Sequence, residues 1–380
     1  MKSAYTLGLK RPFKRYVSKR NVYCVFILSF IMIIAMQFRV MPYENMDYVR
    51  HIELIDNVRH VDQTLWEYLV DQTNKVYLDY RFLYLFNMLL YICAKITDNN
   101  YLLSWICTLI TYGSVLYIAL DWKAGKKYTW IELICNVLVC FALLPFIHVV
   151  SGLRTGVASA IIAVGIYGYL YKKKSLVFFV LHVLAAATCH SFILLSVPFV
   201  FLTKFDLGRK GFVFVLCATA SLQTIAQYLY QNASGFLYAI SRKYVIYNLD
   251  TQHTSWRFVY YTVILTCVLM LLYHFTISAK DKHIIRRINA QSDSPKYELY
   301  RFLAYYACFI IGNFQSYEMI TRQGYILGIL APIIATFTCE NTTKSRRFSQ
   351  IMQTVIRMAL TAITVYASVR YILLYYKHFV

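Results

Sequence analysis

The chain has 380 residues, of which 59% are hydrophobic and only 15% are charged, and its mean hydropathy is +0.49. A soluble domain of this length carries more charge, so the composition excludes that class and predicts an all-α integral membrane protein. The net charge of +21 would suit nucleic-acid binding, but the basic residues fall in short loops between apolar segments. The positive-inside rule accounts for that distribution, and no nucleic-acid partner is expected.

The N-terminal residues form a basic stretch ahead of the first apolar segment, which spans about 23–41. That segment is too long for the apolar core of a signal peptide, and no small-residue cleavage site follows it. We therefore expect residues 1–22 to be a basic cytoplasmic tail and residues 23–380 to form a single polytopic membrane domain. The tail holds seven basic residues: Lys2, Lys10, Arg11, Lys14, Arg15, Lys19 and Arg20.

Further apolar segments of about 20 residues follow, each long enough to cross a hydrocarbon core of about 30 Å, and they predict about 10–12 transmembrane helices in all. Two longer polar stretches, 42–77 and 231–256, are expected to be outer loops. The first holds seven acidic residues against three basic ones, which favours the outside. The later apolar segments lie at about 78–96, 101–120, 130–150, 153–171, 175–202, 212–230, 257–278, 300–319, 321–338 and 350–376.

Basic clusters follow several of these segments, and one crossing per segment cannot place all the clusters on the cytoplasmic side. The conflict is resolved if segment 175–202 is a re-entrant hairpin and an odd crossing lies within 42–96. The 28 residues of segment 175–202 are too few for two full spans but enough for two short arms. Irregular backbone at membrane depth is tolerated only where it is buried in protein or lines a wet cavity, so this hairpin indicates a candidate site.

Two residues at the outer ends of apolar segments are candidates for that site. Arg154 opens segment 153–171 among small residues. It could extend to lipid phosphates, or it could bind a phosphate or diphosphate group inside the protein. His190 lies near the apex of the hairpin, where it could be a hydrogen-bonded core residue or a base that acts near neutral pH. Intramembrane charge is costly and usually functional, which favours the binding role for Arg154.

Arg322 and Asp47 complete the candidate catalytic residues. Glu318 and Arg322 are four residues apart, so they could pair on a continuous helix. If the chain instead turns between them, Arg322 faces the outer site as Arg154 does. Asp47 provides a carboxylate on the outer side, either as a solvated acid or as part of the site.

The second outer loop, 231–256, combines cations with aromatic rings in the run "SRKYVIYN". Aromatic faces stack on sugar rings and cations bind anions, so this loop is a candidate for substrate binding. An aromatic belt at the membrane interface is the alternative explanation. The candidate substrate-binding residues are Arg242, Lys243, Tyr244, Tyr247 and, at the start of the next apolar segment, Arg257.

Motifs for other chemistries are missing from the sequence. It contains no glycine-rich phosphate loop, no G-x-S-x-G nucleophile motif and no cysteine or histidine spacing typical of a metal site. Neither a metal nor another cofactor is expected, and a cytoplasmic nucleotide-sugar donor is unsupported.

Four short motifs, in this order, resemble the EpsG/Wzy family of polysaccharide polymerases. They are an outer aspartate segment ("MDYVRHIELI"), an arginine followed by small residues ("SGLRTGVASAI"), a histidine run ("AAATCHSF"), and a "RKYVIY" loop followed by an arginine-headed segment ("TRQGYILGI"). They extend over about residues 20–340. The family often has an Ile-Arg-Gln start at the first arginine, whereas this chain has Gly-Leu-Arg-Thr.

The resemblance implies a helical fold similar to that of the glycosyltransferase-C enzymes, in a bacterial cytoplasmic membrane with a cytoplasmic N-terminus. Such an enzyme joins undecaprenyl-diphosphate-linked oligosaccharide repeat units into a surface polysaccharide on the outer face, without a metal. Its partners would be the lipid-linked oligosaccharide, the lipid bilayer, a chain-length regulator and a flippase. Arg154 and Arg322 would then stabilise the departing diphosphate, and His190 or Asp47 would act on the acceptor hydroxyl.

Two other functions remain open at this point. A flippase or transporter for lipid-linked glycans would use the same arginines to hold phosphate, although no internal repeat typical of transporters is evident. A membrane O-acyltransferase that modifies the polysaccharide would use an intramembrane histidine, although nothing in the sequence indicates a route for an acyl donor.

Overall fold

The computed structural model describes residues 17–37, 47–74, 82–122, 130–205, 207–234, 257–280 and 295–339, with single positions between 238 and 245 and between 362 and 373. Every regular element in these residues is a helix, which confirms the all-α class. Most of the basic tail and of segment 350–376 lies outside the described residues, so the predictions for them stay predictions.

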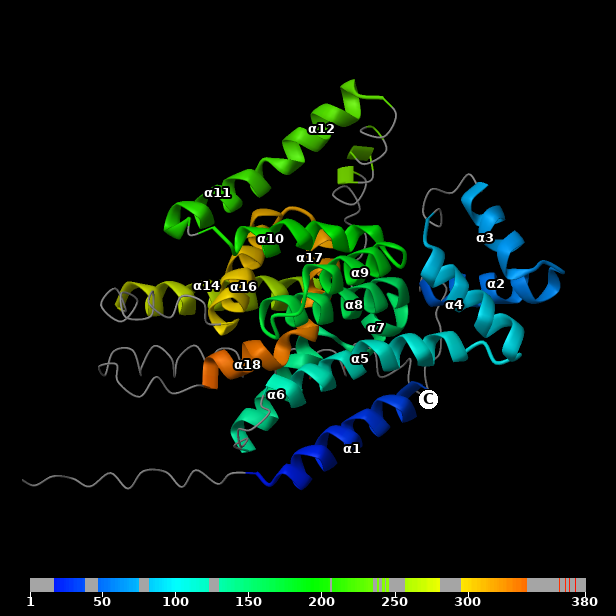
Figure 1. The fold of residues 1–380 in the computed structure, drawn as a ribbon, viewed down its shortest axis with the longest axis horizontal. Coiled ribbons are helices and arrows are strands. Elements are labelled where there is room, and N and C mark those ends of the chain that lie inside the picture. Colours follow the sequence, from blue (N-terminus) through cyan, green and yellow to red (C-terminus); the bar gives the residue numbers. More distant parts are fainter. Residues whose placement is uncertain are drawn as a thin grey trace, which may run out of the picture.

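A bundle of helices forms the centre of the molecule, and α8 and α17 lie at its core (Figure 1). Its elements are α5 (Leu102–Trp122), α6 (Trp130–Leu143), α7 (Phe146–Ser151), α8 (Leu153–Leu170), α9 (Leu176–Ala187), the 3₁₀ helix η1 (Ser191–Ser196), α10 (Val197–Leu202), α14 (Arg257–Lys280), α16 (Pro295–Gly312), α17 (Tyr317–Ile329) and α18 (Ala331–Cys339).

Two further groups of helices lie around this bundle (Figure 1). One group, which we call the lobe, lies at one side and contains α2 (Asp47–His60), α3 (Leu65–Asn74) and α4 (Tyr84–Ile96). The other helices are α1 (Lys19–Gln37), which packs on α5, and the pair α11 (Gly208–Ala220) and α12 (Leu222–Asn232), of which α11 packs on α16. The expected outer loop 42–77 therefore holds two helices, α2 and α3.

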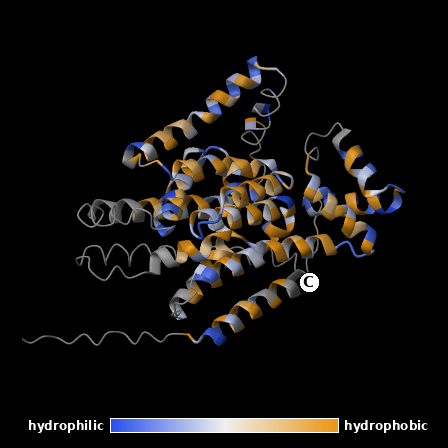
Figure 2. Cartoon of the chain, viewed as in Figure 1, coloured by the Kyte–Doolittle hydropathy of each residue, from blue (hydrophilic) through white to orange (hydrophobic). Residues whose placement is uncertain are grey.

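Three helices in the described residues are long and apolar enough to cross a membrane: Leu102–Trp122, Leu153–Leu170 and Lys210–Asn232. Several shorter apolar helices accompany them. Large apolar side chains also cover the outward face of α9, where Val177, Leu181 and Leu184 are each more than half exposed (Figure 2). Such a surface is stable in lipid rather than in water, which agrees with the membrane protein predicted from composition.

The structure confirms a hairpin in segment 175–202. α9 ends at Ala187, the chain turns through Thr188–His190, and η1 and α10 run back. Each arm has 12 residues, which is about 18 Å for the α-helical first arm and about 21 Å for the second, half of which is 3₁₀ helix, so both are well short of a membrane span. The two ends of the hairpin meet at one carboxylate, because Lys173 Nζ lies 2.6 Å and Lys204 Nζ lies 2.9 Å from the carboxylate oxygens of Glu298.

Several chain segments meet at this end of the bundle, which we call the basic end. Lys172 Nζ is 2.7 Å from Asp121 at the end of α5, and Arg301 of α16 donates a hydrogen bond to the carbonyl of Thr203. The ends of α5, α8 and α10 and the start of α16 therefore lie together. The clusters at 172–174 and 204 share one end of the bundle, as the charge pattern requires, and the membrane side that this end faces stays a prediction.

Close packing brings α8 against its neighbours. Gly165 faces His182 of α9, and a Cβ atom added at Gly156 would lie 2.8 Å from the hydroxyl oxygen of Thr111 on α5. Small residues of this kind let helix backbones approach closely in membrane proteins. The small residues after Arg154 thus serve helix packing, and they fix α8 rigidly within the bundle.

The structure corrects three expected segment boundaries, one of which is that segment 321–338 is divided at Leu330 into α17 and α18. The segment expected at 130–150 is broken at Pro145 into α6 and α7, because proline cannot continue the hydrogen-bond ladder of a helix. The turn expected between 319 and 321 instead occupies 313–316, and Ser316 caps the next helix by accepting a hydrogen bond from the amide of Met319. Glu318 and Arg322 therefore share the continuous helix α17.

Candidate functional site

Three polar side chains form a chain of hydrogen bonds at the end of the bundle opposite the basic end. Arg322 Nε donates to Glu318 Oε2 at 2.7 Å, and Arg322 Nη1 lies 3.2 Å from His190 Nε2. An arginine has donors only, so His190 Nε2 is the acceptor, the ring proton is on Nδ1 and the imidazole is neutral. This link joins α17 to the apex of the hairpin.

Local sequence explains how each of these side chains is positioned. Glu318 and Arg322 are one helical turn apart on α17, which is the spacing at which side chains meet. His190 sits between α9 and η1 in an extended conformation, and its amide donates to the carbonyl of Ala186. The break in the hairpin thus turns the histidine into the protein, where it is 7% exposed.

Arg154 lies in the first turn of α8 and acts electrostatically on His51 of α2. Burial, together with the charges of Arg154 and Arg50, lowers the pKa of His51 to about 3, so that ring is neutral at physiological pH. His51 is 1% exposed and packs on Phe86 with ring centroids 5.3 Å apart. Its Nδ1 has no hydrogen-bond partner among the described residues.

Tyr325 connects the hydrogen-bonded chain at Arg322 with the surroundings of Arg154. Its hydroxyl donates to the carbonyl of His148 on α7, and its ring lies close to Gly152 and Gly156, on either side of Arg154. The charges of Arg322, Asp47 and Glu318 all act on this hydroxyl. Asp47, which is also 3.4 Å from Arg50, therefore lies at the same end of the bundle.

The structure thus brings the four predicted catalytic residues to one end of the bundle. We use the name polar cluster for the set of six side chains that includes them: Asp47, His51, Arg154, His190, Glu318 and Arg322.

The predicted substrate-binding residues are only partly described. The hydroxyl of Tyr244 donates to Asn313 in the turn between α16 and α17, so Tyr244 lies at the end that holds the polar cluster. Arg242 is exposed. Arg257 opens α14 but its side chain is outside the described residues, as are Lys243 and Tyr247.

Sequence reasoning left His51, His148 and Tyr325 out of the site. A signal for His51 exists, because Tyr48, His51, Ile55 and Val58 recur at helical spacing and form the buried face of α2. The high polarity of 42–77 concealed that face, since the stretch was expected to be a loop. His148 and Tyr325 have no comparable signal, because they lie in apolar segments and meet only through the packing of α7 on α17.

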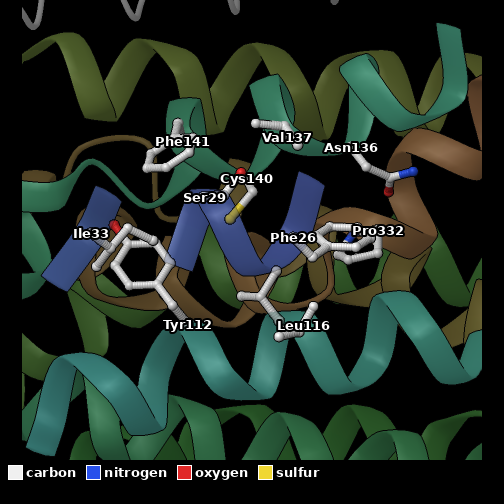
Figure 3. Close-up of a pocket in the computed structure, with 11 residues that line it drawn as sticks. Phe26, Ser29, Ile33, Tyr112, Leu116, Asn136, Val137, Cys140, Phe141 and Pro332 are labelled. Carbon is white, nitrogen blue, oxygen red and sulfur yellow. The ribbon is translucent and has the colours of Figure 1, made fainter. Parts of the chain in front are cut away.

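The described residues also contain a small apolar pocket between α1, α5, α6 and α18 (Figure 3). Phe26, Tyr112 and Phe141 are among its lining residues, and no charged side chain of the described part lines it. The polar chemistry expected from the sequence is therefore not located there. Within the described ranges, no group of three His, Cys, Asp or Glu side chains could hold a metal ion.

The chain has no match among curated proteins or among solved structures, so the expected likeness to glycosyltransferase-C enzymes stays a prediction. A model of one protein family, described as the EpsG family, matches residues 21–378.

Proposed function

Because the chain belongs to the EpsG family, we propose that it joins undecaprenyl-diphosphate-linked oligosaccharide repeat units into a surface polysaccharide on the outer face of a bacterial cytoplasmic membrane. Family membership implies a polysaccharide polymerase with glycosyltransferase-like activity. Beyond what family membership implies, we propose a lipid-diphosphate donor, polymerisation at the outer face and a reaction that needs no metal.

The pair of arginines at the starts of α8 and α17 is the observation that carries this proposal. Arg154 lies in the first turn of α8 and Arg322 in the second turn of α17. The N-terminal end of a helix bears partial positive charge and attracts phosphate. Two guanidinium groups beside two such ends offer several N–H donors, which suits a diphosphate.

The Arg322 guanidinium is held in one orientation before any substrate binds. Glu318 fixes its Nε and His190 accepts from its Nη1, so the cation needs little reorganisation when negative charge develops on the diphosphate oxygens. In this arrangement the lone pair of His190 Nε2 is occupied. His190 therefore positions Arg322, and the proposal gives the role of base to Asp47.

The reaction then follows from these placements. The Asp47 carboxylate takes the proton from the acceptor sugar hydroxyl, and the hydroxyl oxygen forms a bond to the anomeric carbon of the donor. The bond from that carbon to the diphosphate oxygen breaks, and its electron pair leaves with the lipid diphosphate. Arg154 and Arg322 neutralise this leaving group, which is the task that a metal ion performs in other glycosyltransferases.

The test compares cells that contain wild-type protein, no protein, or the variants Arg154→Ala and Arg20→Ala. We expect Arg154→Ala to abolish the polymer ladder, while Arg20→Ala, an exposed arginine of α1, leaves it unchanged. In cells without the protein and in Arg154→Ala cells, mass spectrometry of lipid-linked intermediates should find single repeat units on the outer face. Immunoblots of membranes confirm equal protein levels.

Three outcomes would contradict the proposal. Normal polymer in Arg154→Ala cells would remove Arg154 from the site. Repeat units trapped on the cytoplasmic face would indicate a flippase. Polymer of normal length that lacks acyl groups would indicate an acyltransferase.

A further inference from the structure

The lobe contains a second cavity, which lies outside the polar cluster. It has a volume of about 120 Å³. It lies between the C-terminal half of α2, the helix α3 and the middle of α4. The residues that line it are Leu54, Asn57, Val58, Val61, Gln63, Tyr68, Asp71, Gln72 and Tyr91.

Aromatic rings form one wall of this cavity. The rings of Tyr68 and Tyr91 lie with centroids 5.5 Å apart at an angle of 34°. The hydroxyl of Tyr91 donates to the carbonyl of Gln63 at 2.6 Å, which fixes the ring and joins α4 to the link between α2 and α3. Apolar ring faces of this kind pack against the C–H faces of sugars.

Polar groups line the rest of the cavity, and Gln72 is the most informative of them. Its side chain is 4% exposed and borders the cavity. An amide at the wall of the cavity can donate to one hydroxyl group of a ligand and accept from another. Asn57 and Asp71 add an amide and a carboxylate.

We propose that this cavity binds one pyranose ring of the glycan, at a distance from the reacting bond. The inference rests on the proposed function, since it identifies a second contact for the same substrate. Asp47 of the polar cluster and Asn57 of the cavity are ten residues apart on α2, or about 15 Å at 1.5 Å per residue. The cavity thus holds a sugar further along the oligosaccharide than the one that reacts.

The charge of the lobe defines the class of sugar. Asp71 lines the cavity, Asp62 lies on the link between α2 and α3, and Glu67 lies on α3. Negative charge repels the carboxylate of a uronic acid and tolerates neutral or amino sugars. The ligand is therefore a neutral or amino-bearing pyranose.

Saturation-transfer NMR on the purified full-length protein in detergent micelles tests this inference directly. The probes are the methyl glycosides of glucose, galactose, N-acetylglucosamine and glucuronic acid. We expect saturation transfer to at least one neutral glycoside, and at least threefold less to the glucuronide. Gln72→Leu should abolish the signal, and Asp71→Asn should weaken the discrimination against the glucuronide.

Two controls separate this inference from the proposed function. Glu53→Gln removes an equal charge from an exposed position on α2 and should leave binding unchanged. Arg154→Ala should keep binding while it loses polymer. If Gln72→Leu protein does not fold, Asn57→Leu at an exposed lining position replaces it. The inference is overturned if no glycoside gives a signal, if the cavity variants bind as wild type does, or if Arg154→Ala abolishes binding.

Discussion

The hydrogen bond from Arg322 to His190 links the only histidine of the hairpin apex to a cation. Sequence reasoning left two roles for this histidine, a base or a hydrogen-bonded core residue. The geometry favours a third role, in which the imidazole orients the guanidinium and does not exchange protons. Arg322 is held from both sides, since Glu318 pairs with its other end.

Substitution of His190 distinguishes a positioning residue from a base. Glutamine offers a carbonyl oxygen that accepts from Arg322, but it cannot act as a base near neutral pH. We expect His190→Gln to keep polymerisation within about threefold of wild type and His190→Ala to lose about tenfold or more, since a misaligned cation stabilises charge poorly. The measurement is the polymerisation rate in proteoliposomes with lipid-linked substrate, between pH 6 and 8.

The pH profile supplies the control for this prediction. If His190 were the base, the rate of wild-type protein would fall as the imidazole gains a proton, and His190→Gln would be as inactive as His190→Ala. Equal loss in both variants would contradict the positioning role.

At the scale of elements, the hairpin of α9, η1 and α10 depends on its closure at the basic end. Glu298 holds the residues on either side of it through Lys173 and Lys204. Burial alone would raise the pKa of Glu298, but the hydrogen bonds from the two lysines outweigh burial and hold that pKa below its usual value of 4.5. The ionised carboxylate is therefore the form that closes the hairpin.

If the Glu298 carboxylate closes the hairpin, the melting temperature of the protein should depend on pH. A carboxylate whose pKa is lower in the folded state contributes stability fully above about pH 5, and this contribution is lost as pH falls below 4.5 toward the folded pKa. At pH 7 we expect Glu298→Gln to lose about 1 kcal/mol, because both lysines are partly exposed and solvent screens each pair. Reaction of the buried cysteines, such as Cys189, with a thiol-reactive dye reports unfolding.

The matched comparison is the loss of melting temperature between pH 7 and pH 4 in the two proteins. The loss should be smaller in Glu298→Gln than in wild type. Identical losses would show that the carboxylate contributes nothing to the closure.

The sequence predicts those elements that have a local pattern, such as an apolar run or a basic cluster. The hairpin could be predicted because Lys172–Lys174 and Lys204 must share one side, and α8 because an apolar run of 18 residues follows Gly152. The lobe was not predicted, because α2 and α3 are polar helices and only the periodicity of their apolar residues reveals a buried face. The meeting of Tyr325 with His148 depends on tertiary packing, which no local pattern records.

At the scale of the whole molecule, charge is divided between two ends. The basic end collects the lysines near 172 and 204, whereas the other end carries the polar cluster and the acidic lobe. The positive-inside rule predicts that the basic end faces the cytoplasm, which would place the polar cluster at the outer side. This orientation would place the two arginines on the side where the proposed polymer grows.

Thiol labelling of intact cells tests this orientation. In a background where Cys24, Cys135, Cys217 and Cys339 are replaced by serine, Trp66→Cys places a thiol on the lobe and Lys174→Cys places one at the basic end. We expect a membrane-impermeant maleimide to label Trp66→Cys in intact cells and Lys174→Cys only after permeabilisation. The reverse pattern would put the arginines at the cytoplasmic face, where the proposed outer-face polymerisation could not occur.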